Sequence, residues 1–141
     1  MTEPRHPAPL APRIRILIAD DHALVRSGLR MILETEPDLE VVGEAAGGAE
    51  ALALALAERP DVVLADISMP PPDGIALASL LCEQLPSTRT LVVSMHEEAG
   101  LVAQALAAGA AGYVIKRAAP AALIRAVRQV ARGETFVDTT N

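Results

Sequence analysis

The sequence predicts a single α/β domain in which a parallel sheet carries helices on both faces. Short runs rich in β-branched residues alternate with helical patterns five times along the 141 residues. Four of these runs are apolar almost throughout, which is typical of strands buried on both faces. The connections are short, so each helix returns the chain to a neighbouring parallel strand. A chain of this length buries roughly two thirds of its unfolded surface in one core.

Each expected strand is followed by a helix with apolar residues at a spacing of three or four. The strands are residues 14–19, 39–44, 61–66, 90–95 and 112–116. The apolar stripes are Val25, Leu29, Ile32 and Leu33; Leu52 and Leu56; Ala78, Leu81 and Leu85; Leu101, Val102, Ala105 and Leu106; and Leu123, Ile124, Val127 and Val130. Pro86 closes the third helix and Gly109 the fourth. Pro120 suits the first turn of the fifth helix, and Gly133 marks its end.

Composition narrows the class of protein further. Hydrophobic residues make up 51% of the chain, which excludes a disordered chain, and aromatic residues only 1%, so the core is aliphatic. The formal net charge of −6 argues against direct binding to DNA or to an anionic membrane. No signal-peptide pattern or run of ~18 apolar residues occurs, and we expect a cytoplasmic protein. We expect the single cysteine, Cys82, to be buried as a small hydrophobe.

Polar residues that can carry chemistry follow four of the five expected strands. Asp20 and Asp21 come after the first strand, Asp66 ends the third, Ser94 lies at the end of the fourth, and Lys116 ends the fifth. In open parallel sheets, ligands bind outside the carboxyl ends of the strands, where these ends meet. We therefore expect the three carboxylates, the hydroxyl and the ammonium to converge on one edge of the sheet.

Together these groups point to a cation and a phosphoryl group. Three carboxylates with no cysteine nearby suit a hard cation bound through oxygen, and Mg²⁺ fits best. Such a cation would remove the repulsion between Asp20 and Asp21. Asp66, flanked by Mg²⁺ and Lys116, can act as a nucleophile toward phosphorus. A single aspartate after a strand is usually only a loop residue or a helix cap. The prediction therefore rests on the occurrence of all these residues together at one edge of the sheet.

Other signals lead to weaker hypotheses. His22 and His96 flank the same edge and would suit a transition-metal hydrolase, but neither lies at a recognised ligand spacing. Arg125, Arg128 and Arg132 form a stripe on the last helix, which we interpret as a solvated face, with a dimer or output contact surface as the alternative. No GxGxxG or GxxxxGK motif occurs, which disfavours dehydrogenases and P-loop enzymes.

Four segments carry a family resemblance: "IADDHALVRSGL", "ADISMPPPDG", "VVSMHEE" and "AAGAAGYVIKRA". They resemble the receiver domain of bacterial two-component response regulators of the NarL/FixJ type, over residues 14 to 138. The resemblance implies a flavodoxin-like (CheY-like), doubly wound, five-stranded sheet of order 2-1-3-4-5. We expect a disordered Pro-rich arm at residues 1–12, the receiver domain at 13–133, and at 134–141 the start of a linker toward a helix-turn-helix domain. The chain is then either a piece of a transcription regulator or a free-standing receiver.

The resemblance also implies a role for each site residue. Asp66 is the phosphoacceptor. Asp21 binds Mg²⁺ directly, Asp20 holds it largely through water, and the backbone carbonyl of Ser68 is a further metal ligand.

The implied switch residues lie on the last two strands. Ser94 is the hydroxyl that hydrogen-bonds the phosphoryl group, Lys116 pairs with that group, and Tyr113 is the aromatic residue that moves with Ser94. Met95, next to Ser94, shields the phosphoryl group from water, which predicts slow self-dephosphorylation.

The expected function is therefore that of a phosphorylation-driven switch and not of a metabolic enzyme. A sensor histidine kinase is the expected partner, a homodimer forms on phosphorylation, and DNA is reached only through an output domain. One alternative is a receiver-like interaction module that works without phosphorylation. Another is a phosphohydrolase with an aspartate nucleophile, which would need paired aspartates around that nucleophile on its first strand.

Overall fold

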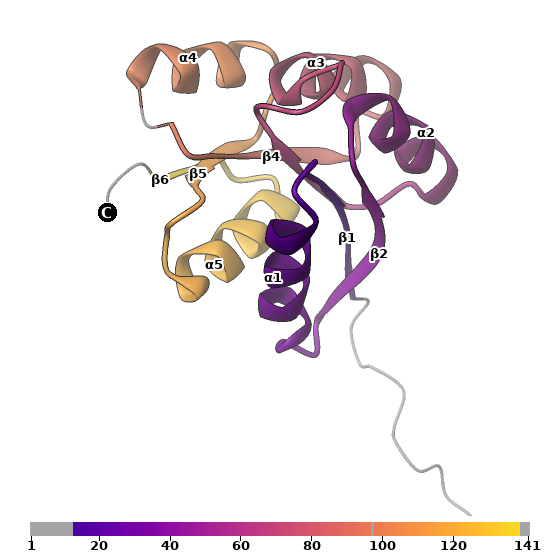
Figure 1. Ribbon diagram of the computed structural model, residues 1–141, viewed down its shortest axis with the longest axis vertical. Helices are drawn as coiled ribbons and strands as arrows, with labels where there is room; N and C mark the ends of the chain where they lie inside the picture. The colour runs from indigo at the N-terminus through magenta and orange to yellow at the C-terminus, as the bar shows by residue number, and fades with distance from the viewer. Residues whose placement is uncertain (1–12, 97, 139–141) are drawn as a thin grey trace, which may run out of the picture.

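The structure, a computed structural model, describes residues 13–96 and 98–138. The expected arm at residues 1–12 lies outside the described residues, as do residues 97 and 139–141. Strands and helices alternate along the described chain (Figure 1). They are β1 (Ile14–Ala19), α1 (Ala23–Glu34), β2 (Leu39–Ala45), α2 (Gly48–Glu58), β3 (Val62–Asp66), α3 (Gly74–Gln84), β4 (Arg89–Ser94), α4 (Ala99–Ala107), β5 (Gly112–Ile115), α5 (Pro120–Ala131) and β6 (Phe136–Asp138).

The strands form one sheet in the order β2-β1-β3-β4-β5-β6, and every neighbouring pair is parallel. The predicted fold class and the order 2-1-3-4-5 are confirmed. The sixth strand was not predicted, because three residues are too short to give a periodic signal. Its register is set by pairing of Gly112 with Phe136. The sheet thus extends into the segment where the sequence predicts a linker.

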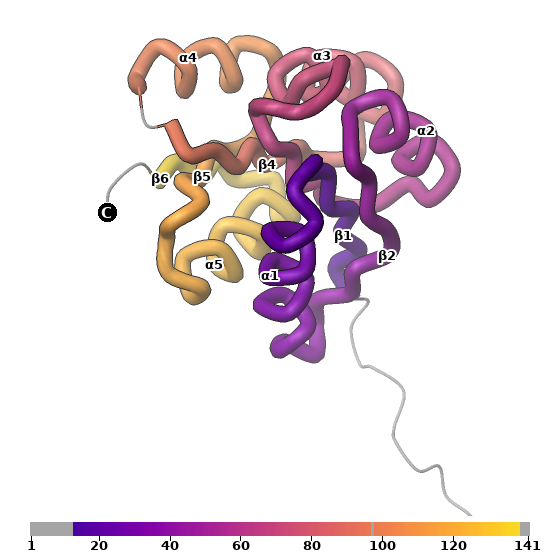
Figure 2. The backbone as a smooth tube through the Cα atoms, viewed as in Figure 1, coloured from indigo at the N-terminus to yellow at the C-terminus, as the bar shows by residue number. Residues whose placement is uncertain are grey.

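The helices cover both faces of the sheet, as predicted. Figure 2 shows α1 beside α5 on one face, with α2, α3 and α4 on the other. Alternation along β1 explains the two layers, since successive side chains of a strand point to opposite faces. Ile16 and Ile18 pack in the core under α1 and α5, whereas Leu17 and Ala19 pack in the core under α2 and α3.

Two burial predictions are wrong. On α2, Leu52 packs against the core as predicted, but Leu56 is 41% exposed, and the fully buried residues of the helix are Ala51 and Ala55. The sequence of α2 is apolar nearly all round, so periodicity does not identify the face that packs on the sheet. Cys82 is exposed. Its side chain lies against Gly109, where an added Cβ would be 3.0 Å from both the Cβ and the Sγ of Cys82.

The C-terminal end of the described chain is packed against the domain. Phe136 is buried in the core cluster beside α5, and its N–H donates to the carbonyl of Ala111 at 3.1 Å. Gly133, the predicted stop of α5, has a φ of 89°, a conformation that favours glycine. Between residues 13 and 138, position 97 aside, no helix has the length and apolarity needed to cross a bilayer.

Candidate functional site

Two buried carboxylates lie where β1 and β3 end. Asp20 follows β1, and its Oδ1 accepts a hydrogen bond of 2.8 Å from the N–H of His22, which starts α1. Asp66 ends β3, and its Oδ1 accepts one of 3.2 Å from the N–H of Ser68. Each carboxylate thus uses one oxygen locally, as aspartates often do in turns. The second oxygens, the two Oδ2 atoms, face a shared space.

Lys116 reaches that space from the end of β5. Its Nζ lies 2.9 Å from Oδ2 of Asp20 and 3.2 Å from Oδ2 of Asp66. Both contacts are ion pairs, and apart from Lys116 neither Oδ2 has a hydrogen-bonding partner among the described residues. Buried polar atoms are normally hydrogen-bonded, so each Oδ2 retains capacity for a ligand.

The charges of the site are unbalanced. Burial raises the pKa of Asp66, against the opposing effects of the Ser68 N–H and the Lys116 ammonium, and the neighbouring Asp20 raises it further. Burial acts to lower the pKa of Lys116, but the carboxylates of Asp20 and Asp66 outweigh it and raise that pKa. One ammonium therefore faces two carboxylates, and Asp21 adds a third nearby. Such a site favours a cation.

A small metal ion fits this group of residues. Asp20, Asp21, His22 and Asp66 each offer one ligand atom, and these atoms all lie within 4.8 Å of one another. Opposite ligands of an octahedral ion with bonds of about 2.1 Å are about 4.2 Å apart, so little adjustment is needed. The oxygen donors suit a hard divalent cation. The sequence predicted that His22 and His96 flank this edge, and of the two only His22 belongs to the described group of ligand atoms.

Ser94 and Tyr113 both contact one residue of the loop after β4. Oγ of Ser94, which is fully buried, accepts a hydrogen bond of 2.9 Å from the N–H of His96. The Tyr113 hydroxyl donates to the carbonyl of the same His96 at 2.6 Å. Burial raises the pKa of Tyr113, which keeps the phenol protonated as a donor. The two predicted switch residues are thus linked through the peptide groups of a single residue.

The loop after Asp66 is held against α2. The N–H of Gly48 donates to the carbonyl of Pro70 at 2.9 Å. A Cβ placed on Gly48 would lie only 1.8 Å from the carbonyl oxygen of Pro72, so the two backbones are in close contact. Proline rings fix φ through this segment, and the docking adds a tertiary restraint to that stiffness.

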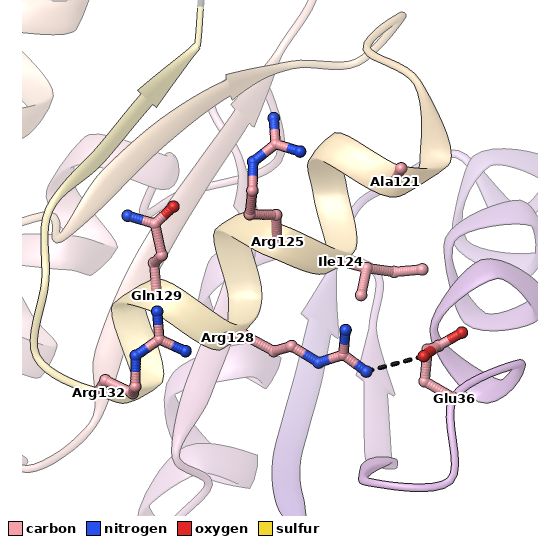
Figure 3. Close-up of a pocket in the computed structure, with 7 residues that line it drawn as sticks. All are labelled: Glu36, Ala121, Ile124, Arg125, Arg128, Gln129 and Arg132. Atoms are coloured by element: carbon pink, nitrogen blue, oxygen red, sulfur yellow. Dashed lines mark hydrogen bonds and ion pairs between the residues drawn. The ribbon is translucent and has the colours of Figure 1, made fainter.

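Arg125 and Arg132 on α5 are exposed, as predicted for a solvated face, whereas Arg128 is half-buried and contacts another segment of the chain. Arg128 donates to both carboxylate oxygens of Asp38, at 3.0 and 2.8 Å. It also donates to Oε1 of Glu36 at 2.7 Å (Figure 3). These bonds lower the pKa of Asp38. The guanidinium of Arg125 lies 5.7 Å from the ring centroid of Phe136. The long side chain of Arg128 thereby ties α5 to the loop between α1 and β2.

The chain matches the family described as response regulator receiver domain over residues 16–128, and it belongs to that family. It is a receiver domain of two-component signalling and not a conventional enzyme.

Individual relatives agree with this assignment. The oxygen regulatory protein NreC of Staphylococcus epidermidis is 44% identical over 126 residues, which cover 89% of this chain and 58% of NreC. The chain therefore spans little more than half the length of this curated relative. The receiver domain of NarL from Mycobacterium tuberculosis is 39% identical with a TM-score of 0.85, covering 88% of this chain and 100% of that one. The isolated receiver domain of RcsB from Salmonella enterica serovar Typhimurium is 31% identical with a TM-score of 0.79, covering 89% and 94%.

Proposed function

We propose that this receiver domain accepts a phosphoryl group from a sensor histidine kinase onto Asp66 and changes conformation in response. The observation that carries the proposal is the buried Asp66 carboxylate, whose Oδ2 has no hydrogen-bond partner in the described chain and lies 3.2 Å from the Lys116 ammonium. Support also comes from the related receiver domain of RcsB, whose structure is described as determined in the presence of the phosphomimetic BeF3⁻.

In the proposed transfer, one carboxylate oxygen of Asp66 forms a bond to phosphorus. The bond from phosphorus to the histidine nitrogen of the donor breaks, and its electron pair stays on that nitrogen. Lys116 stabilises the negative charge on the transferring oxygens. Asp20 holds the ammonium in place through its 2.9 Å contact, so that the charge is positioned before the donor arrives.

We propose that Mg²⁺ is the cation of this site. Asp21, Asp66 and the backbone carbonyl of Ser68 would bind it, with Asp20 largely through water. When bound, the ion neutralises negative charge on the oxygens around phosphorus. The buried oxygens of Asp20 and Asp66 that lack hydrogen-bond partners support this ligand set.

The switch is proposed to run through Ser94, Lys116 and Tyr113. Phosphorylation adds about 1.5 to 2 negative charges. Converting a 1:99 conformational ratio into 99:1 takes about 5.5 kcal/mol, and a charge-assisted hydrogen bond contributes about 1.5 to 3 kcal/mol. Ser94 and Lys116 together approach that requirement. Turning the Ser94 hydroxyl toward the phosphoryl group would release His96, to which the Tyr113 hydroxyl is also bonded.

In the cell, we propose that the domain at residues 13–133 controls a DNA-binding output domain through a linker that starts at 134–141, and that it forms a homodimer on phosphorylation. The relatives that support this role include NreC, of which the chain covers 58%. The proposed sensor histidine kinase would phosphorylate the domain in the cytoplasm.

The test is the intact mass after incubation with acetyl phosphate, with and without Mg²⁺. We expect a Mg²⁺-dependent gain of one phosphoryl group that is lost in Asp66→Asn. Asp73→Asn is the matched control, because Asp73 lies in the loop after β3 and accepts from the N–H of Ala76, a helix cap that asparagine can replace. No gain in the unmodified chain, or an equal gain in Asp66→Asn, would refute the proposal. Sustained release of phosphate from other phosphoesters would indicate the phosphohydrolase instead.

A further inference from the structure

We propose that His22 is a nitrogen ligand of the cation bound at Asp20, Asp21 and Asp66, and that it raises the affinity of the site for transition metals relative to its affinity for Mg²⁺. The inference rests on the cation site of the proposed function. Its basis is the position of the imidazole: Nδ1 of His22 lies 3.1 Å from Oδ1 of Asp21 and 3.4 Å from Oδ1 of Asp20. An ion held by these carboxylates is within reach of the ring nitrogen.

The backbone fixes His22 beside the carboxylates. Its N–H donates to Oδ1 of Asp20 at 2.8 Å, and its carbonyl accepts from the N–H of Arg26 at 3.0 Å, in the first turn of α1. The side chain of His22 is 67% exposed. Coordination of an ion by its ring nitrogen would therefore leave most of the imidazole in contact with water. The backbone of His22 is therefore fixed by two hydrogen bonds, and the Nδ1 edge of its ring lies against the carboxylates of Asp20 and Asp21.

Independent evidence for a ligand comes from the buried carboxylates. The Oδ2 atoms of Asp20 and Asp66 have no hydrogen-bond partner in the part of the chain that the structure describes, and their side chains are only 2% and 4% exposed. Ligand atoms from both residues fall within 4.8 Å of the His22 nitrogen. The histidine thus borders two buried carboxylate oxygens whose one charged neighbour among the described residues is the Lys116 ammonium, so two negative charges share one positive charge.

The chemistry of the donors predicts the change in preference. Mg²⁺ binds oxygen and retains its waters, and an imidazole adds little to its binding. Imidazole nitrogen suits Ni²⁺ and other first-row transition metals, whose affinity for such sites rises from Mn²⁺ to Cu²⁺. Replacing Mg²⁺ by Ni²⁺ therefore raises the binding affinity less at a site of carboxylates alone than at a site that also includes a ring nitrogen. His22 is therefore expected to raise the affinity for Ni²⁺ relative to Mg²⁺.

The other histidines provide controls. Nδ1 of His96 lies 3.6 Å from Oε2 of Glu98, and its side chain is outside the described cluster of ligand atoms. His6 lies outside the described residues. Since the sequence has three histidines, replacing His6 and His96 with Gln leaves His22 as the single imidazole.

The first measurement is pulsed electron paramagnetic resonance of Mn²⁺ bound to the full chain carrying His6→Gln and His96→Gln. We expect modulation from a coordinated ¹⁴N nucleus, and we expect His22→Asn on this background to abolish it. Asparagine is a favoured residue at a helix N-cap, so His22→Asn preserves the start of α1.

The second measurement is the ratio of Ni²⁺ to Mg²⁺ affinity by calorimetry. We expect His22→Asn to lower it by about tenfold, the lower end of the range for residues that act on a bound metal. His96→Gln should leave it unchanged.

The outcomes separate this inference from the proposed function. Mn²⁺ binding without nitrogen modulation, together with an unchanged affinity ratio in His22→Asn, would overturn the role of His22 and leave the carboxylate site intact. If neither Mg²⁺ nor Mn²⁺ binds the unmodified chain, the cation site itself is refuted and the inference falls with it. A fall in the ratio for His96→Gln equal to that for His22→Asn would also overturn the inference, because the effect would not depend on contact with the cluster.

Discussion

Gly48→Ala tests the contact between α2 and the loop that follows Asp66. An ideal Cβ at position 48 lies 1.8 Å from the carbonyl oxygen of Pro72, 2.6 Å from its nitrogen and 2.7 Å from its carbonyl carbon. These are backbone atoms of a proline segment, so no flexible side chain can move aside. The two segments would have to separate until the contact reaches at least 3.0 Å.

The loss of stability can be estimated from what this separation disrupts. The hydrogen bond from Gly48 to Pro70, at 2.9 Å, is broken, and such a bond contributes about 0.5 to 1.5 kcal/mol. Overpacking of a close contact costs about 1 to 3 kcal/mol. The higher helix propensity of alanine returns at most about 1 kcal/mol. We therefore expect a net loss of about 2 kcal/mol and a fall in Tm of about 8 °C.

Urea unfolding followed by circular dichroism measures this loss. Gly28→Ala is the matched control, because Gly28 lies inside α1 and a Cβ there meets nothing within 4 Å. It is expected to raise the free energy of unfolding by up to about 1 kcal/mol. If Gly48→Ala stabilises the protein as Gly28→Ala does, the close docking of the proline loop on α2 is refuted.

Three further predictions concern charge and the switch. Arg128→Ala should lower the stability at neutral pH by about 1 kcal/mol or less, because the ion pair with Asp38 is partly exposed and solvent screens it. Arg128 lowers the pKa of Asp38 in the folded protein. The stabilisation by this ion pair is therefore complete above the unfolded-state aspartate pKa of about 3.9, and it is lost as the pH falls through the lower pKa of the folded state. Acid titration of the unfolding free energy should therefore be shallower below about pH 4 in Arg128→Ala, and an unchanged slope would contradict the role of this pair. Ser94→Ala should still be phosphorylated on Asp66 but should weaken phosphorylation-dependent dimerisation at least tenfold, as expected from a hydrogen bond of about 1.5 to 3 kcal/mol; normal dimerisation by analytical ultracentrifugation would refute its role. Met95, which is 58% exposed beside the site, should slow loss of the phosphoryl group, so Met95→Ala should lose it several-fold faster by intact mass; rapid loss in the unmodified chain, unaffected by the substitution, would contradict this.

Much of the fold and the site could be predicted because both follow from strands that are buried on two faces. Their apolar runs are hard to mistake, and their carboxyl ends must share an edge, which places Asp20, Asp66 and Lys116 together. The face of α2 could not be predicted, since small and large apolar residues alternate along it. Ala51 and Ala55 are the fully buried residues of this helix and lie in the same core cluster as Leu17 and Ala19 of β1.

Contacts between segments distant in sequence were beyond prediction for a different reason. Arg128 and Asp38 are separated by 90 positions, and no local pattern distinguishes this arginine from its neighbours on the helix. The pairing of β6 likewise depends on the position of β5 and not on the three residues themselves. His22 joins the carboxylates through the geometry of the first turn of α1, which a ligand-spacing motif does not describe.

The aromatic composition of the chain makes the interior of the switch directly observable by spectroscopy. The sequence contains one tyrosine and no tryptophan, and that tyrosine is Tyr113, fully buried with its hydroxyl bonded to the His96 carbonyl. The one phenylalanine, Phe136, absorbs at shorter wavelength, so emission excited selectively in the tyrosine band originates from a single ring at a known position. A rearrangement around that hydroxyl on phosphorylation, metal binding or substitution at Ser94 can therefore be followed without an introduced probe.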